Sequence, residues 1–236
     1  MKQIIVDNRI SEKCELSLIK EGFSLLKLPS DPLLGSAVAS HPDTVMFYSD
    51  SELITTADYC DVAAYIFSDI REYNPDIKIS FTADRRGSQY PDDCILNALK
   101  IGNRIFCKSD TISDRIKELA DAHGYEIIHT NQGYPACVTL HFGNSAITSD
   151  AGLGSLLQKY GIRVTLIGTE GISLPPYEYG FIGGASGVIG DKIYFFGDIS
   201  THPDASIILD AIRAEGFIPI SLSDESLVDF GGIISL

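Results

Sequence analysis

The chain has 236 residues, 44% of them apolar and 21% charged, a balance typical of a folded globular protein rather than a disordered one. Its 18 Lys and Arg residues against 32 Asp and Glu residues give a formal net charge of −14. This excess of negative charge repels nucleic-acid phosphates and anionic lipids, so we expect no binding to nucleic acid or to a membrane. No apolar segment approaches the roughly 20 residues that a membrane-spanning helix needs.

The cysteines and histidines favour a cytoplasmic protein without a metal or another cofactor. The five cysteines are odd in number and form no Cys-x-x-Cys pair, which is typical of reduced thiols rather than of disulfides or a zinc site. The five histidines are dispersed and form no His-Glu-x-x-His arrangement. The apolar stretch at the start of the chain is too short for a signal peptide.

The first predicted elements are a strand at residues 3–6, a helix at 11–21 and a strand at 23–28. Gly22 is expected to end the helix, because glycine readily adopts the left-handed conformation that closes many helices. This strand, helix and strand lack only a preceding strand to match the units that follow.

From residue 44 onward, a unit of strand, strand, helix and strand recurs four times. The clearest copy has strands at 95–101 and 104–108 around a Gly-Asn turn, then apolar residues at helical spacing, a stop at Gly124 and a strand at 125–129. Pro219 cannot donate to a ladder, so the last strand of the final copy should lie at a sheet edge. The other copies are predicted at 44–48, 53–56, 58–73 and 76–81, at 138–142, 145–148 and 162–167, and at 186–189, 192–196 and 217–222.

An aspartate precedes each of the five predicted helices, and we expect these side chains to act as helix N-caps. They are Asp7, Asp58, Asp110, Asp150 and Asp198. Residues 233–236 can supply the strand that the first unit lacks. We therefore predict an α/β fold in a single domain over residues 1–236, a five-fold pseudosymmetric β/α propeller of ββαβ units closed by the C-terminal strand. The alternative is a doubly wound sheet, but no Gly-x-Gly-x-x-Gly follows the first strand.

Five such units resemble the pentein superfamily. It contains the guanidino-group-modifying enzymes, among them deiminases, dimethylarginine hydrolases and amidinotransferases, and also a non-catalytic ribosome anti-association factor. Residues 41–47, His-Pro-Asp-Thr-Val-Met-Phe, are similar to the arginine deiminase stretch whose histidine is the general acid/base and whose aspartate binds the guanidinium. Residues 231–235, Gly-Gly-Ile-Ile-Ser, are similar to the Gly-Gly-x-x-Cys that carries the nucleophile of several of these enzymes. Ser235 stands here in place of that cysteine.

In a propeller the starts of the first strands converge on a central cavity, and the candidate site residues are those expected there. Cys137 or Cys94 is the candidate nucleophile, since a cysteine beside a histidine and a carboxylate can attack an amidine or amide carbon. His41 is the candidate proton shuttle. The candidate groups for holding a cationic substrate are Asp43, Asp93, Ser186 and Ser235. The alternative for both cysteines is that they are small buried apolar residues.

Two functions follow from this pattern. One is a cysteine-dependent hydrolase or transferase acting on a guanidino or amidino group of a small molecule in the central cavity. The other is a non-catalytic pentein that binds a small ligand or a protein partner, as Ser235 suggests. The sequence does not define the oligomeric state.

Overall fold

The computed structural model describes residues 2–236, which form five three-stranded sheets and one two-stranded sheet. In each three-stranded sheet the middle strand pairs antiparallel with one neighbour and parallel with the other. The sheets are β17(Ile234–Ser235)-β1(Lys2–Asp7)-β2(Phe23–Leu28), β3(Met46–Ser49)-β4(Glu52–Thr56)-β5(Lys78–Thr82), β6(Ala98–Ile101)-β7(Arg104–Cys107)-β8(Glu126–His129), β9(Thr139–Phe142)-β10(Ser145–Thr148)-β11(Arg163–Leu166) and β13(Ser186–Ile189)-β14(Lys192–Phe195)-β15(Ile218–Ser221). The short sheet pairs β12(Ile172–Ser173) with β16(Leu227–Val228).

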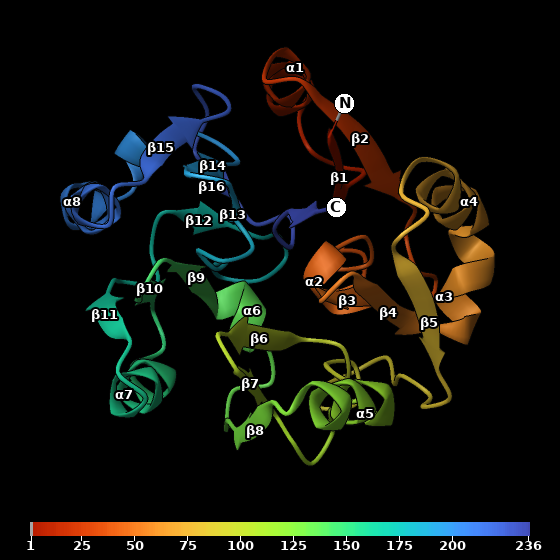
Figure 1. Cartoon of the computed structure of the whole chain (residues 1–236). Coiled ribbons are helices and arrows are strands. Elements are labelled where there is room, and N and C mark those ends of the chain that lie inside the picture. The colour runs from red at the N-terminus through yellow and green to blue at the C-terminus, as the bar shows by residue number, and fades with distance from the viewer. Residues whose placement is uncertain (1) are drawn as a thin grey trace.

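A helical segment connects the middle strand of each three-stranded sheet to its parallel outer strand. These segments are α1(Glu12–Lys20), α3(Ala57–Val62) with α4(Ala64–Tyr73), α5(Asp114–His123), α7(Ala151–Lys159), and η1(Ile199–Thr201) with α8(Ala205–Ala214). Parallel strands need such a crossover, whereas the antiparallel pairs within β3 to β15 are joined by tight turns. Figure 1 shows α1, α4, α5, α7 and α8 at the rim, with β3, β6, β9, β13 and the C-terminal end nearer the middle.

Each pair of neighbouring sheets encloses a hydrophobic core, so the described residues form five such cores around the molecule. Alternation along a strand lets one strand serve two of them. In β1, Ile5 packs in the core shared with β4 and α4, whereas Ile4 and Val6 pack in the core shared with β14. The sheets therefore hold one another in place through packing.

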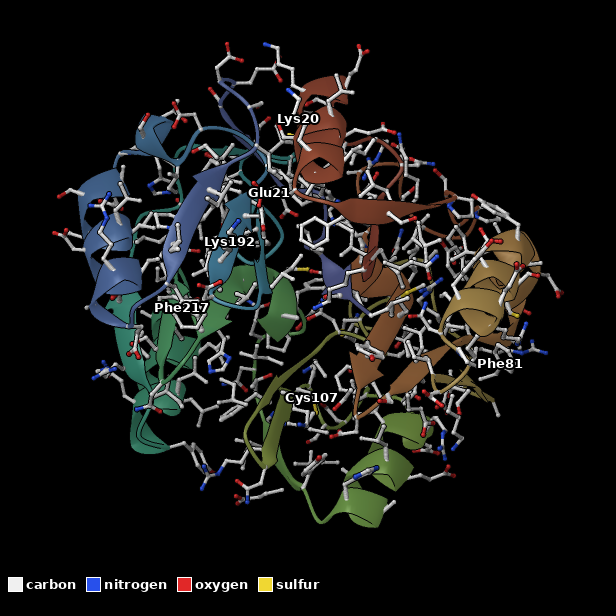
Figure 2. The ribbon with its side chains drawn as sticks, turned by 45° about the horizontal axis from the view of Figure 1, so that its top comes forward. Lys20, Glu21, Phe81, Cys107, Lys192 and Phe217 are labelled. Carbon is white, nitrogen blue, oxygen red and sulfur yellow. The ribbon has the colours of Figure 1, made fainter. Side chains whose placement is uncertain are left out.

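Polar and aromatic contacts add to these cores at the periphery. Glu21, just after α1, accepts hydrogen bonds from Lys192 at 2.6 Å and from Tyr194 at 3.0 Å, both on β14 (Figure 2). Phe217, before β15, stacks edge-on against Phe142 of β9 with ring centroids 5.6 Å apart. Both contacts join different sheets, so they fix the positions of neighbouring units.

The predicted pairing of the two ends of the chain is confirmed. Ile4 lies opposite Ser235 and Ile5 opposite Ile234 in an antiparallel pair, and the Leu236 N–H donates to the carbonyl oxygen of Gln3 at 3.1 Å. The outer position predicted for the Pro219 strand is also confirmed, since β15 ends its sheet.

The prediction that all five aspartates cap helices is wrong for three of them. Asp150 caps α7 and Asp198 caps η1, but the N-caps of α1, α3 and α5 are Ser11, Thr56 and Ser113. The helix expected at 58–73 is interrupted at Ala63, whose backbone leaves the helical conformation between α3 and α4. In residues 2–236 no helix is both long and apolar enough to cross a membrane.

Candidate functional site

Two one-turn helices lie directly before inner strands and place the candidate catalytic side chains. The helix α2(Pro42–Val45) precedes β3, with His41 at its N-cap, and α6(Pro135–Val138) precedes β9 and carries Cys137. Proline suits the first helical position because it has no N–H to lose there and its φ is already helical. Strands were predicted from residues 44 and 138, where these turns end, and the X-Pro steps at 42 and 135 were the signal for the turns.

A cavity of about 510 Å³ lies above these two turns. His41 and Cys137 both line it, together with the carboxyl groups of Asp93, Glu178 and Asp229. Half of the other lining residues are aromatic, namely Tyr90, Tyr134, Tyr177, Tyr179 and Phe181. Within residues 2–236, no lysine or arginine lines this cavity, so its fixed charge is negative.

A smaller cavity of about 270 Å³ lies among the inner strands themselves. Asp43, Ser186 and His141 line it, as do the glycine pairs of residues 183–184 in part and 231–232. Asp43 therefore faces a different cavity from His41, although they are two residues apart. The structure thus places His41, Cys137 and Asp93 at the larger cavity and Asp43 and Ser186 at the smaller one.

His41 lies between two buried carboxylates. Its Nε2 is 3.8 Å from Asp7 Oδ2, its Nδ1 is 3.8 Å from Asp229 Oδ1, and the side chain is only 1% exposed. Burial lowers the pKa of His41, while Asp229 and Asp7 act in the opposite direction. The Nε2 atom, which faces Asp7, is buried and has no hydrogen-bond partner among the described residues.

Asp229 is held by the backbone around it. Its carboxylate accepts hydrogen bonds from the N–H groups of Phe181 at 2.9 Å and Gly231 at 3.0 Å. A Cβ on Gly184 would lie 1.9 Å from Asp229 Oδ1, so only glycine allows this close approach. Burial raises the pKa of Asp229 despite the opposing effect of His41.

Gly231 fixes the other side of His41. It has a φ of +70°, and a Cβ there would lie 2.3 Å from His41 Cβ. Its carbonyl oxygen accepts a hydrogen bond from the Asp43 N–H at 3.2 Å. The Gly-Gly segment at residues 231–232 therefore packs against the His-Pro-Asp segment at residues 41–43, although the two are far apart in the sequence.

Cys137 is buried next to Asp43 and Asn97. The Asn97 amide donates to Cys137 Sγ at 3.2 Å and to the Asp43 carbonyl at 2.9 Å, and its Oδ1 accepts from the Ala136 N–H at 2.9 Å. Burial, Asp43 and Asp229 raise the pKa of Cys137 well above its ordinary value, so the free protein holds a neutral thiol there. Burial, followed by Asp229, raises the pKa of Asp43 to about 8.

The other predicted site residues lie in different surroundings. Cys94 is buried with its Sγ 3.0 Å from the Pro91 carbonyl, and it lines neither cavity. Ser186 donates to the Ile182 carbonyl at 2.6 Å, beside the smaller cavity. Ser235 lies in β17 and lines neither cavity, and its hydroxyl has no partner among residues 2–236.

Asp93 occupies the larger cavity with Tyr134. The Asp93 side chain belongs to a residue only 8% exposed, and its Oδ1 has no hydrogen-bond partner in the described part of the chain. Burial raises the pKa of the Tyr134 phenol, and the neighbouring Asp93 adds to that effect. An unpaired buried carboxylate oxygen facing a cavity is a ready acceptor for a ligand N–H.

Sequence reasoning missed Asp7, Asn97, Asp229 and Tyr134 as parts of this arrangement. Asp7 precedes a helix, and this position led to its prediction as an N-cap. It is instead fully buried and paired with Arg9, whose Nε lies 2.9 Å from Asp7 Oδ1. The Tyr-Pro steps at 90 and 134 were the visible signal for Tyr134. In the part of the chain that the structure describes, no group of three or more His, Cys, Asp or Glu side chains is placed to hold a metal.

Solved structures with a similar fold are guanidino-modifying enzymes. Dimethylarginine dimethylaminohydrolase from Pseudomonas aeruginosa, as a cysteine-to-serine mutant complexed with citrulline, matches with a TM-score of 0.58 at 10% identity over 94% of this chain and 92% of that chain. Inosamine-phosphate amidinotransferase from Streptomyces griseus matches with a TM-score of 0.55 at 11% identity over 95% and 88%. An amidinotransferase of the saxitoxin biosynthetic pathway from Microseira wollei matches with a TM-score of 0.55 at 12% identity over 94% and 88%.

These likenesses concern the fold: the chain has a mixed α/β fold, and the predicted resemblance to the pentein superfamily is confirmed at the level of the fold. The chain belongs to the family described as "Family of unknown function (DUF6873)", which matches residues 5–234. Among curated proteins, no sequence matches it.

Proposed function

We propose that this protein binds a small guanidino or amidino compound in the larger cavity and acts on its amidine carbon through Cys137. The observation that carries this proposal is the lining of that cavity. It combines a thiol, a neutral histidine and three carboxyl groups, and within residues 2–236 it includes no cationic side chain. The similar enzymes named above act on guanidino compounds or transfer amidino groups, which supports the same ligand class.

The proposed first step is attack of Cys137 Sγ on the amidine carbon. Binding of a cation beside the thiol lowers the pKa of the thiol, because the positive charge stabilises the thiolate. The thiol proton passes to His41 as the S–C bond forms, and His41 then gives it to the leaving amine as the C–N bond breaks. Asp229 stabilises His41 while it is protonated, and Asp93 Oδ1 accepts a hydrogen bond from the ligand.

The second step releases the thiol. In a hydrolase, water adds its oxygen to the same carbon after giving one proton to His41, and the C–S bond breaks as Cys137 regains a proton. In a transferase, an amine takes the place of water. Asp43 is not assigned a ligand contact in this scheme, because it faces the smaller cavity.

A non-catalytic binding protein is the second candidate function. Two observations favour it: the high pKa of the Cys137 thiol in the free protein, and the serine at position 235. In this case the same acidic cavity would hold the cationic ligand without turnover.

We further propose that the five three-stranded sheets form a five-fold pseudosymmetric β/α propeller closed by the C-terminal strand. The shared strand order and the pairing of β17 with β1 support this arrangement. The five free cysteines support a cytoplasmic location.

The test combines product detection with cysteine and histidine variants. Agmatine, L-arginine and their N-methylated forms are incubated with the protein, and released ammonia or amine and the ureido product are measured. We expect turnover in the wild type, none in Cys137→Ser, and wild-type turnover in the matched Cys94→Ser variant. His41→Gln is expected to lower turnover at least about 100-fold, whereas the matched His202→Gln variant keeps it.

Three outcomes would overturn the catalytic proposal. Saturable binding of a guanidino compound by calorimetry without any product supports the second candidate. Turnover that survives Cys137→Ser excludes the assigned nucleophile. Failure of every guanidino compound to bind excludes both candidates.

A further inference from the structure

Among the described residues, the lining of the larger cavity offers a ligand carboxylate no lysine or arginine as a partner. Arg9 and Arg86 do not line it, although the buried Nε of Arg86 has no hydrogen-bond partner among the described residues. The guanidinium of Arg9 donates hydrogen bonds to the Asp7 carboxylate and to the backbone carbonyls of Ser36 and Ala37. The two terminal nitrogens of Arg86 donate to Asp31 and to the Thr44 carbonyl. A carboxylate entering this cavity would therefore lose its hydration without gaining an ion pair, which is costly.

The carboxyl groups in the cavity wall lie at two depths. Asp229 and Asp93 are buried, at 1% and 8% exposure, whereas Glu178 is exposed in the segment between β12 and β13. Asp93 also keeps its unpartnered Oδ1, so the deep position has a free acceptor. An elongated ligand can thus meet one acidic group at its inner end and another at its outer end.

The wall between these depths suits a cationic or apolar ligand body. Tyr90 and Tyr134 pack with ring centroids 5.9 Å apart, and both line the cavity. Aromatic faces attract guanidinium groups and also pack well against methylene chains. The chain's net charge of −14 adds a long-range attraction that grows with the positive charge of the ligand.

We propose that the ligand is a guanidino amine, positively charged at both ends and without a carboxylate, rather than a guanidino amino acid. This inference rests on the proposed function and names the ligand class of the same cavity. The guanidinium binds at Asp93 and Asp229, beside Cys137, and the terminal ammonium binds at Glu178.

The test compares ligands that differ only at the outer end. Calorimetric titration at neutral pH and low salt uses agmatine, L-argininamide and L-arginine on the same protein. We expect agmatine to bind at least tenfold more tightly than L-arginine, and L-argininamide to recover most of the difference because its carboxyl group is neutralised. L-arginine binding as tightly as agmatine overturns this inference and leaves the proposed function standing.

A matched pair of variants locates the outer contact. Glu178→Gln is expected to weaken agmatine binding about threefold to tenfold and to leave L-arginine binding within twofold. Glu170→Gln removes the same charge from an exposed position outside the cavity and is expected to change neither. Equal effects of the two variants would show that only net charge matters and would overturn the assignment of Glu178. Failure of all three ligands to bind removes the proposed function and this inference with it.

Discussion

The tripeptide His-Pro-Asp occurs twice in this chain, at residues 41–43 and 202–204, and the two copies have different surroundings. His41 lies near the middle of the molecule at α2 and lines the larger cavity, whereas His202 lies at the rim just before α8 (Figure 1). Burial lowers the pKa of both imidazoles. Two buried carboxylates from distant segments face His41, but the Nδ1 of His202 only accepts the Asp204 N–H at 3.0 Å. The tripeptide alone therefore carries no function.

An aspartate near each histidine, Asp229 for His41 and Asp204 for His202, gives the largest expected difference between the two copies. Asp229→Ala leaves two buried N–H groups unpaired, and we expect it to lower the free energy of unfolding by about 2–4 kcal/mol. Asp204→Ala removes one hydrogen bond from the Gly168 N–H at an exposed position, with an expected loss under about 1 kcal/mol. Urea denaturation measures both. Equal losses would contradict the distinction between the two environments.

A glycine with positive φ packs against each copy of the tripeptide and provides a second, smaller test. A Cβ on Gly231 would lie 2.3 Å from His41 Cβ, and one on Gly171 would lie 2.6 Å from Pro203 Cδ. Each Gly→Ala variant is expected to lose about 1–3 kcal/mol of stability through backbone strain and crowding. Only Gly231→Ala should also weaken ligand binding in calorimetry, because it displaces His41. Loss of binding in Gly171→Ala would contradict this assignment.

The smallest expected difference between the two copies of the tripeptide lies in how the free energy of unfolding depends on pH. Burial holds the pKa of Asp43 at about 8, so the folded protein keeps a proton that the unfolded chain has released. The contribution of Asp43 to the free energy of unfolding is fully present below the pKa of this aspartate in the unfolded chain, and it is lost as pH rises through 8. The lowered pKa of His41 has the opposite effect, because it makes the free energy of unfolding rise with pH up to about 6.5, the ordinary histidine pKa. The decline caused by Asp43 should therefore be seen from about pH 6.5 to 8.

For one proton the slope is at most about 1.4 kcal/mol per pH unit. Denaturation midpoints measured across this range should flatten in Asp43→Asn, while the control variant Asp204→Asn keeps the wild-type decline. A wild-type profile that is level from pH 6.5 to 8 would contradict the buried, protonated state of Asp43.

Periodicity in the sequence predicted most of the fold because each unit repeats local signals. Apolar runs around Gly102 and the helix stop at Gly124 depend only on nearby residues, and both are where they were expected. The end-to-end pairing of Ile4 with Ser235 could be predicted because the first unit lacked a strand. Capping was less predictable, since an aspartate, serine or threonine close to a helix start can each take the N-cap position.

The candidate site was less predictable because its geometry depends on residues that are distant in sequence. His41 and Cys137 could be named from their neighbours, and both line the larger cavity. Nothing local indicates that Asp7 faces His41 instead of capping α1, or that Asp43 faces a separate space. Cys94 precedes an inner strand much as Cys137 does, and only packing turns it away from both cavities.

The side chain of Asn97 joins the two one-turn helices, through the carbonyl of Asp43 on one side and the Ala136 N–H on the other. Its amide offers one donor end and one acceptor end at a fixed separation. An aspartate there would set a carboxylate against the Asp43 carbonyl, and a glutamine would be one methylene too long. Asn97 therefore sets the separation of α2 and α6 and also contacts the Cys137 thiol at 3.2 Å, so a substitution at position 97 would change both the separation of the two turns and the surroundings of that thiol.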